Sequence, residues 1–244
     1  MYHSEIIGHG MYVPPDIVTN HDLEKMMETS HDWIIQRSGI EQRHWAKPEV
    51  STTDLAVHAC ENAIAEAGID KSEIDCLLFA TLSPDHDFPG AACFLQPKLG
   101  LSEIPAIDIR QQCSGYLYAM SVADAFIKVG QYKTILVVGA EIHSKGLDKT
   151  TRGRDVAVLF GDGAGAVIMR RTEVKDAQKD SHVWSTHLFS EGMMMRRMTM
   201  VMINNNLCVR LFVLNHTVRL SRWRGVAAKG GVALLGRQYA RVFR

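Results

Sequence analysis

Residues 193–244 contain no aspartate and no glutamate, although they hold ten arginines and lysines, so this stretch carries a net charge of +10. Residues 1–192 carry all 27 acidic residues and 17 of the 27 basic ones, a net charge of −10. So abrupt a change can mark a basic arm that binds nucleic acid or a membrane surface. The stretch also contains many apolar residues, which a solvated arm would avoid, so neither partner is expected.

Long hydrophobic runs and metal-ligand spacings are also missing. No run approaches the ~18 apolar residues of a membrane span, and the first residues lack the basic-then-apolar form of a signal peptide. The five cysteines show no short metal-ligand spacing, and the histidines at 31 and 86 have one or two adjacent aspartates but no further ligand. We therefore expect a cytoplasmic protein with reduced thiols and no metal site.

Strand-like and helix-like segments alternate along the first 170 residues. Strands are expected over residues 4–8, 75–82, 104–109, 134–139, 156–160 and 164–169, several as continuous apolar runs typical of strands buried on both faces. Helices are expected over residues 20–29 (capped by Asn20), 53–67, 89–99 and 114–129. This alternation predicts an α/β fold with a mostly parallel sheet.

The glycine-rich run at residues 161–165 resembles a dinucleotide-binding fingerprint at first sight. That fingerprint needs a strand before it and a helix after it. Residues 166–169 instead favour a strand, so we interpret the run as a tight turn between two strands. No nicotinamide or flavin site is predicted.

Cys113 lies where the strand expected at 104–109 gives way to the helix expected at 114–129. The N–H groups and the positive dipole end at a helix start favour the thiolate, which is the nucleophilic form of cysteine. Ser114 and Gly115 are small enough to let a substrate approach. The competing interpretation is a buried structural cysteine, the common state of an intracellular thiol.

Three motifs decide between these interpretations. Residues 31–44, residues 160–166 and the Cys113 junction resemble, in order and spacing, the motifs of β-ketoacyl-acyl-carrier-protein synthase III. Residues 81–86 and 112–115 also resemble the related condensing enzymes that make alkylquinolone precursors. The resemblance covers residues 1–192 and then stops.

The resemblance implies a thiolase-like fold, in which two similar halves form five layers, α/β/α/β/α, usually in a homodimer. Residues 1–174 match the N-terminal half with the nucleophile, residues 175–192 match the start of the second half, and the rest of that half is missing. Residues 193–244 are interpreted as an aberrant basic tail, frameshifted or disordered, in preference to a genuine basic extension.

The resemblance also implies the chemistry. Cys113 would take an acyl group from coenzyme A, and the acyl-enzyme would condense with malonyl-acyl carrier protein as carbon dioxide leaves, which initiates fatty acid synthesis. Acyl-CoA is a substrate, so no cofactor is implied. The family's catalytic histidine and asparagine have no matching motif here, so impaired activity is expected. The alternatives are a quinolone- or polyketide-type condensing enzyme and an inactive fragment with a basic binding tail.

Four residues match family positions that bind coenzyme A: Thr29, Trp33, Arg37 and Arg152. An indole offers adenine a stacking surface and a guanidinium can stack or bind phosphate. Arg154 competes with Arg152, which is favoured because it keeps the spacing from Cys113. Phe88 aligns with an aromatic that crosses the dimer interface into the partner's acyl pocket, although it would serve equally as a loop anchor. Without the resemblance, Trp33 would be a core anchor and Arg37 a solvated charge.

Overall fold

The computed structural model describes residues 2–174, 176, 180–191, 196–203, 207–214 and 217–221, with side chains up to residue 189. The strands of the first 174 residues are β1 (His3–Tyr12), β2 (Ile17–Thr19), β3 (Gln42–His44), β4 (Cys76–Ala80), β5 (Ala106–Ile109), β6 (Thr134–Glu141) and β7 (Gly163–Thr172). The helices are α1 (Asn20–Glu24), α2 (His31–Ser38), α3 (Thr52–Ala67), α4 (Ala91–Leu99), α5 (Gly115–Lys128) and α6 (Arg154–Ala157). Short 3₁₀ turns lie at Lys71–Glu73, Gln112–Ser114 and Thr151–Gly153.

The main sheet has five strands in the order β1-β7-β6-β4-β5. β4 pairs in parallel with both β5 and β6, whereas β7 runs antiparallel to β6 and β1. Four of the five strands therefore point the same way, as the mostly parallel prediction requires. The carboxyl ends of β4, β5 and β6 meet at one edge, where ligand sites form in open α/β sheets.

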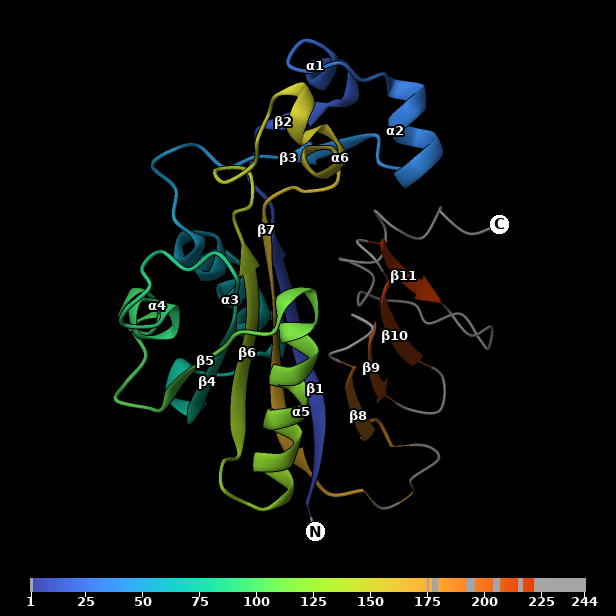
Figure 1. The fold of residues 1–244 in the computed structure, drawn as a ribbon. Coiled ribbons are helices and arrows are strands. Elements are labelled where there is room, and N and C mark those ends of the chain that lie inside the picture. The colour runs from blue at the N-terminus through green and yellow to red at the C-terminus, as the bar shows by residue number, and fades with distance from the viewer. Residues whose placement is uncertain are drawn as a thin grey trace.

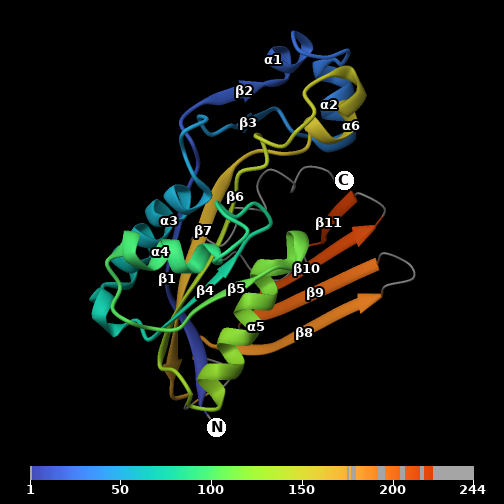
Figure 2. The ribbon, with the colours of Figure 1, turned by 60° about the vertical axis from the view of Figure 1, so that its left-hand side comes forward.

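Alternation along each strand divides the core into two layers. Phe79 and Val138 face α3 and α4 on one side of the sheet. Leu78 and Val137 face α5 on the other side. All five residues of β4 are buried, as its continuous apolar sequence predicted. Figure 2 shows α3 and α4 on one face and α5 on the opposite face.

A smaller layer of α1, α2, α6, β2 and β3 lies beyond the end of the sheet at which β6 ends (Figure 1). Its core contains Leu23 and Ile34 from the first part of the chain and Ala157 and Val158 from the second, all buried. Segments more than 100 residues apart therefore build this layer. The signature at 31–44 is adjacent in space to the segment before the glycine run.

A second, four-stranded sheet follows in the order β11-β10-β9-β8, with all its pairs antiparallel. Its strands are β8 (Val183–Glu191), β9 (Arg196–Ile203), β10 (Leu207–Leu214) and β11 (Thr217–Ser221). β8 contacts α5, where the hydroxyls of Ser121 and Thr186 are 2.9 Å apart. Strands β9 to β11 fall within the interval 193–244. Residues 222–244 lie outside the described residues, and the proposed origin of the tail stays a prediction.

Three local predictions are wrong. Residues 156–160 form no strand, because α6 ends at Ala157 and the chain then buries Ala157 and Val158 in the small layer. The glycine run consequently joins a helix to β7 and is not a turn between two strands. The first helix is also shorter than expected, and Thr19 caps it rather than Asn20. The Thr19 hydroxyl accepts from the backbone N–H of Asp22, while Asn20 is buried and donates to the Ile40 carbonyl at 2.7 Å.

Candidate active site

Cys113 lies in the 3₁₀ turn Gln112–Ser114, between the end of β5 at Ile109 and the start of α5 at Gly115. Its side chain is exposed. The predicted strand–turn–helix context of Cys113 is therefore confirmed, and the turn sits at the carboxyl edge of the parallel strands.

The backbone at this turn is strained. Gln112 has a φ of 38°, in the left-handed region that residues other than glycine rarely adopt. Such a conformation costs about 1–3 kcal/mol and persists where the surrounding structure imposes it, often at functional sites. α5, which lies wholly within the described residues, carries no acidic side chain in its first turn to offset the positive end of its dipole. Both features suit a turn that presents a nucleophile.

Other cysteines in the described part of the chain differ from Cys113. Cys60 and Cys76 are fully buried, and burial raises the pKa of the Cys60 thiol well above its usual range and that of Cys76 to about 12. Thiols of this kind are inert toward electrophiles, because the thiolate is the reactive species. Cys93 is exposed like Cys113, but it lies within α4. Labelling experiments must therefore distinguish Cys113 from Cys93.

Two guanidinium groups lie close to the indole ring of Trp33 in α2. The central carbon of Arg37 is 4.2 Å from the centroid of the indole, and that of Arg154 is 5.1 Å away. Arg154 also donates to the carbonyl of Glu28 at 2.8 Å, which ties α6 to the segment before α2. A flat aromatic ring and two cations form a surface suited to a nucleotide with phosphate groups.

Arg152 is placed differently from Arg154. Its side chain is 89% exposed and its Nε donates to Asp148 at 2.8 Å. The hydrogen bond from the Thr150 hydroxyl, followed by the contact with Arg152 and the Thr150 N–H, lowers the pKa of Asp148 to about 2. The structure thus brings Arg154, the competing candidate, against Trp33, and it does not bring Arg152 there.

Thr29 precedes α2 by two residues, and its hydroxyl oxygen is buried without a hydrogen-bond partner among the described residues. A buried polar atom of this kind normally finds a partner, so the site can accept a ligand group. The neighbouring Glu28 accepts from Arg154, and its own N–H donates to the Thr151 hydroxyl at 3.0 Å. Thr29 therefore directly follows a residue that is bonded to both Thr151 and Arg154.

Phe88 is 90% exposed and precedes Pro89 in the loop that leads to α4. The end of this loop is held by Asp108 of β5, whose carboxylate accepts from the backbone N–H of Ala92 at 3.2 Å. Partial burial raises the pKa of Asp108, and the hydrogen bonds from the start of α4 oppose this rise.

The glycine run has a structural role that sequence reasoning missed. Asp162 is buried and accepts from the backbone N–H groups of Ala46 and Ser144 at 2.6 and 2.9 Å and from the Ser144 hydroxyl at 2.5 Å. Gly161 is closely packed, because a Cβ there would lie 3.0 Å from that of Arg43 and 3.2 Å from the His44 carbonyl oxygen. The run therefore locks the loop after β6 onto the segment after β3.

Arg43, within the signature at 31–44, is almost completely buried and acts as an internal tie. Its guanidinium donates to the Asn20 side chain at 2.9 Å and to the carbonyls of Val18 and Val158 at 3.2 and 3.1 Å. Burial lowers the pKa of Arg43 to about 10. The signature thus combines a structural arginine with the partly buried Trp33 and the exposed Arg37.

The polar cluster around Asp85 is engaged in helix capping. Asp85 accepts from the backbone N–H of Thr52 at 2.6 Å and from the hydroxyl of Thr53, at the start of α3. The His86 ring lies against Phe94, with ring centroids 4.6 Å apart. Among the described residues, no group of three potential metal ligands is suitably placed. No helix in the same residues is long and apolar enough to cross a membrane.

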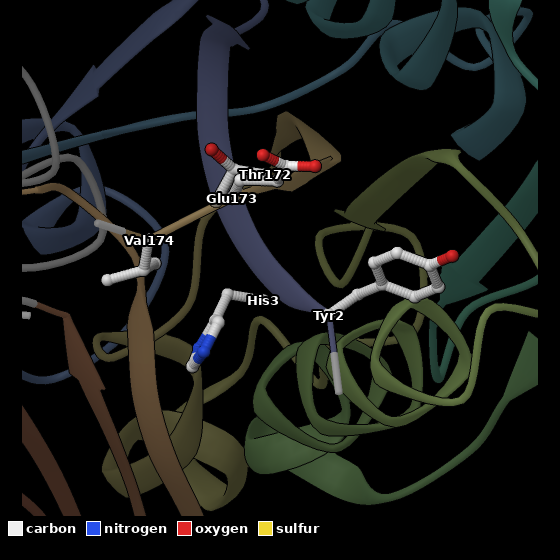
Figure 3. A pocket seen from close by; sticks show the side chains of 5 residues that line it. All are labelled: Tyr2, His3, Thr172, Glu173 and Val174. Atoms are coloured by element: carbon white, nitrogen blue, oxygen red, sulfur yellow. The ribbon is translucent and has the colours of Figure 1, made fainter.

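A cavity of about 270 Å³ lies at the opposite edge of the main sheet from Cys113, where β1 begins and β7 ends. Figure 3 shows its lining by Tyr2, His3, Thr172, Glu173 and Val174. The His3 ring makes an edge contact with His182, with centroids 5.2 Å apart, and His182 stacks on Trp184. These contacts join β1 to the start of β8.

The pH dependence of stability should reflect His3. Burial, together with the nearby His182 and Lys128, lowers the pKa of His3 below its ordinary value of 6.5. The unfolded chain therefore binds this proton more readily, so the contribution of His3 is complete above pH 6.5 and decreases as the pH falls below that value. The melting temperature measured from pH 8 to pH 5 should fall below pH 6.5. The melting temperature of a His3→Phe variant should fall less over the same pH range. An equally steep decline in both proteins would contradict the assignment of this pH dependence to His3.

Comparison with known proteins identifies the family that shares this arrangement. The family model for 3-oxoacyl-[acyl-carrier-protein] synthase III matches residues 107–192. β-Ketoacyl-[acyl-carrier-protein] synthase III 1 of Vibrio parahaemolyticus is 46% identical over 190 residues, which are 78% of this chain and 58% of that protein. The synthase III of Ehrlichia canis is 47% identical over 192 residues, 79% of this chain and 58% of that protein.

The crystal structure of 3-oxoacyl-[acyl-carrier-protein] synthase III from Aquifex aeolicus superimposes with a TM-score of 0.73 at 43% identity, covering 78% of this chain and 59% of that one. The sheet order, the helix layers and the cysteine turn thus define a thiolase-like α/β unit. Over the matched segment, the chain belongs to the β-ketoacyl-acyl-carrier-protein synthase III family. It spans 58% of the length of these curated relatives.

Proposed function

We propose that this chain accepts an acyl group from an acyl-coenzyme A on Cys113, the first half of a condensing-enzyme reaction. The thiolate attacks the thioester carbonyl, a new carbon–sulfur bond forms, and the thiol of coenzyme A leaves after taking up a proton. The observation that carries the proposal is an exposed cysteine in a strained turn before a helix, at the carboxyl edge of the sheet.

Coenzyme A would bind through its nucleotide at Trp33, Arg37 and Arg154. The adenine would stack on the indole, and the guanidinium groups would contact the ring or the phosphates. Thr29 stays a predicted coenzyme A contact from the family resemblance, because its hydroxyl oxygen is buried and would reach a ligand only after a local rearrangement. We assign Arg154 in place of the sequence-favoured Arg152 because it faces the indole. A nucleotide contact by Arg152 stays an untested prediction.

The second half-reaction and its partners follow from the family. The acyl group on Cys113 would be attacked by an enolate formed when malonyl-acyl carrier protein loses carbon dioxide, and the cysteine thiolate would be released. We expect this step to be impaired in this chain, because the family's catalytic histidine and asparagine have no matching motif here. We propose an acyl carrier protein as partner, a homodimer in which Phe88 reaches the other subunit, and a cytoplasmic location. The names of the relatives support the carrier protein, and the 90% exposure of Phe88 supports an intersubunit contact.

The test is a burst measurement with a panel of acyl-CoAs. Mixing the protein with acetyl-, octanoyl- or anthraniloyl-CoA should release up to one equivalent of free coenzyme A from the preferred substrate, detected by a thiol reagent after the protein is removed. Preference for anthraniloyl-CoA would indicate a quinolone-type enzyme instead of one that initiates fatty acid synthesis. Absence of release with every member would contradict the proposed half-reaction.

A further inference from the structure

Glu141, the last residue of β6, binds the loop that follows β4, and its carboxylate also lies 3.8 Å from the Nε2 of His143. Its carboxylate accepts from the backbone N–H groups of Leu82 and Ser83 at 2.8 and 3.1 Å. It also accepts from the Ser83 hydroxyl at 2.6 Å and from the Thr81 hydroxyl at 3.4 Å. The Ser83 hydroxyl oxygen in turn accepts from the N–H of Ile142 at 2.8 Å. The Glu141 carboxylate is therefore bonded to backbone N–H groups of the loop after β4, and the Ser83 hydroxyl is bonded to the backbone N–H of the residue after β6.

This contact lies beside the turn that carries Cys113. A Cβ on Gly115 would be 3.5 Å from the Cβ of Ala80, so the first turn of α5 packs on the last residue of β4. A Cβ on Gly139 would be 3.0 Å from the Tyr116 ring, which places the same helix turn over β6. The loop held by Glu141 starts with the residue after Ala80. It therefore begins next to the cysteine turn.

We propose that Glu141 is a positioning residue that fixes residues 81–83 as a wall beside the Cys113 sulfur and so limits the size of the group that this sulfur carries. The acyl character of that group rests on the proposed function. Hydrogen bonds to an ionised carboxylate are about twice as strong as neutral ones, so a single side chain can hold the loop. A glutamine of the same shape would offer one oxygen and present N–H donors toward the loop N–H groups, which would move the wall.

The experiment measures how Cys113 discriminates small from large electrophiles. In a full-length Cys93→Ala background, alkylation of Cys113 by N-methylmaleimide and by N-octylmaleimide is followed by peptide mass. The test variant is Glu141→Gln. The matched control is Asp75→Asn, because Asp75 accepts from the N–H groups of Lys133 and Thr134 at 2.8 and 3.1 Å where β4 and β6 begin, at the far edge of the sheet.

Loosening the wall should raise the octyl-to-methyl rate ratio by about fivefold in Glu141→Gln and leave Asp75→Asn within about twofold of the parent, since small misplacements at a reaction centre have large rate effects. Ser83→Ala, which removes one hydrogen bond to Glu141, should shift the ratio in the same direction and decides the matter if Glu141→Gln does not fold. An unchanged ratio, or equal changes in the test and control variants, would overturn the proposal. Maleimides require no coenzyme A, so this result is independent of whether acyl transfer occurs.

Discussion

Replacing Arg154 with alanine is expected to weaken the binding of coenzyme A by about tenfold to a hundredfold, because the ligand would lose a cation next to the indole and a charge-assisted contact to phosphate. The guanidinium lies 5.1 Å from the Trp33 ring and is held by the Glu28 carbonyl, so it is already placed for the ligand. Isothermal titration of the purified protein with coenzyme A measures the dissociation constant directly.

Arg152→Ala is the matched control, two residues away and with the same charge change. Its side chain is exposed and paired with Asp148, and it should alter the dissociation constant by no more than about threefold, the range of a screened surface charge. A larger loss in Arg152→Ala than in Arg154→Ala would restore the sequence-based assignment of Arg152. Trp33→Ala should weaken binding at least as much as Arg154→Ala.

The largest effect on stability is expected from Asp162→Ala. This change leaves the buried backbone N–H of Ser144 and the partly buried N–H of Ala46 without their acceptor and should lower the free energy of unfolding by about 3 kcal/mol or more. The loop after β6 would separate from the segment after β3. Urea denaturation followed by circular dichroism gives the free energy of unfolding, provided that the transition is reversible.

Asp148→Ala provides the comparison for a carboxylate at the surface. Asp148 accepts from the N–H and hydroxyl of Thr150 and from Arg152, contacts that are exposed to solvent. Its removal should lower the free energy of unfolding far less than removal of Asp162, because exposed charges are screened by solvent. Equal losses in the two variants would show that Asp162 acts as an ordinary surface carboxylate and would contradict its assignment as the tie of the glycine run.

The main sheet was largely predictable because the apolar pattern within each strand is enough to indicate it. β4 and β6 are continuous apolar runs, and burial on both faces requires that pattern whatever the partner strand. Residues 156–160 have a similar apolar composition but no strand neighbour. They form part of α6 and the loop after it, because Ala157 and Val158 pack against α1 and α2. Tertiary packing overrode the local preference there.

The site was predictable where one local motif defines it and not where distant segments meet. Ten consecutive residues, 107–116, are enough to predict the strand–turn–helix context of Cys113. The contact between Trp33 and Arg154 joins positions more than 100 residues apart, so spacing along the chain favoured Arg152 instead. The roles of Asp162 and Glu141 could not be predicted for the same reason. Each carboxylate binds backbone N–H groups of a loop remote in sequence, and no sequence pattern shows this.

The most direct test of acyl transfer is the mass of the intact protein before and after incubation with its preferred acyl-CoA. The account predicts a species near 27.2 kDa that gains a single acyl group. Peptide mapping should place that group on Cys113, and the gain should be absent in Cys113→Ala and retained in Cys93→Ala. A gain that survives Cys113→Ala, or no gain with any acyl-CoA, would contradict the assignment of Cys113 as the acyl-accepting nucleophile.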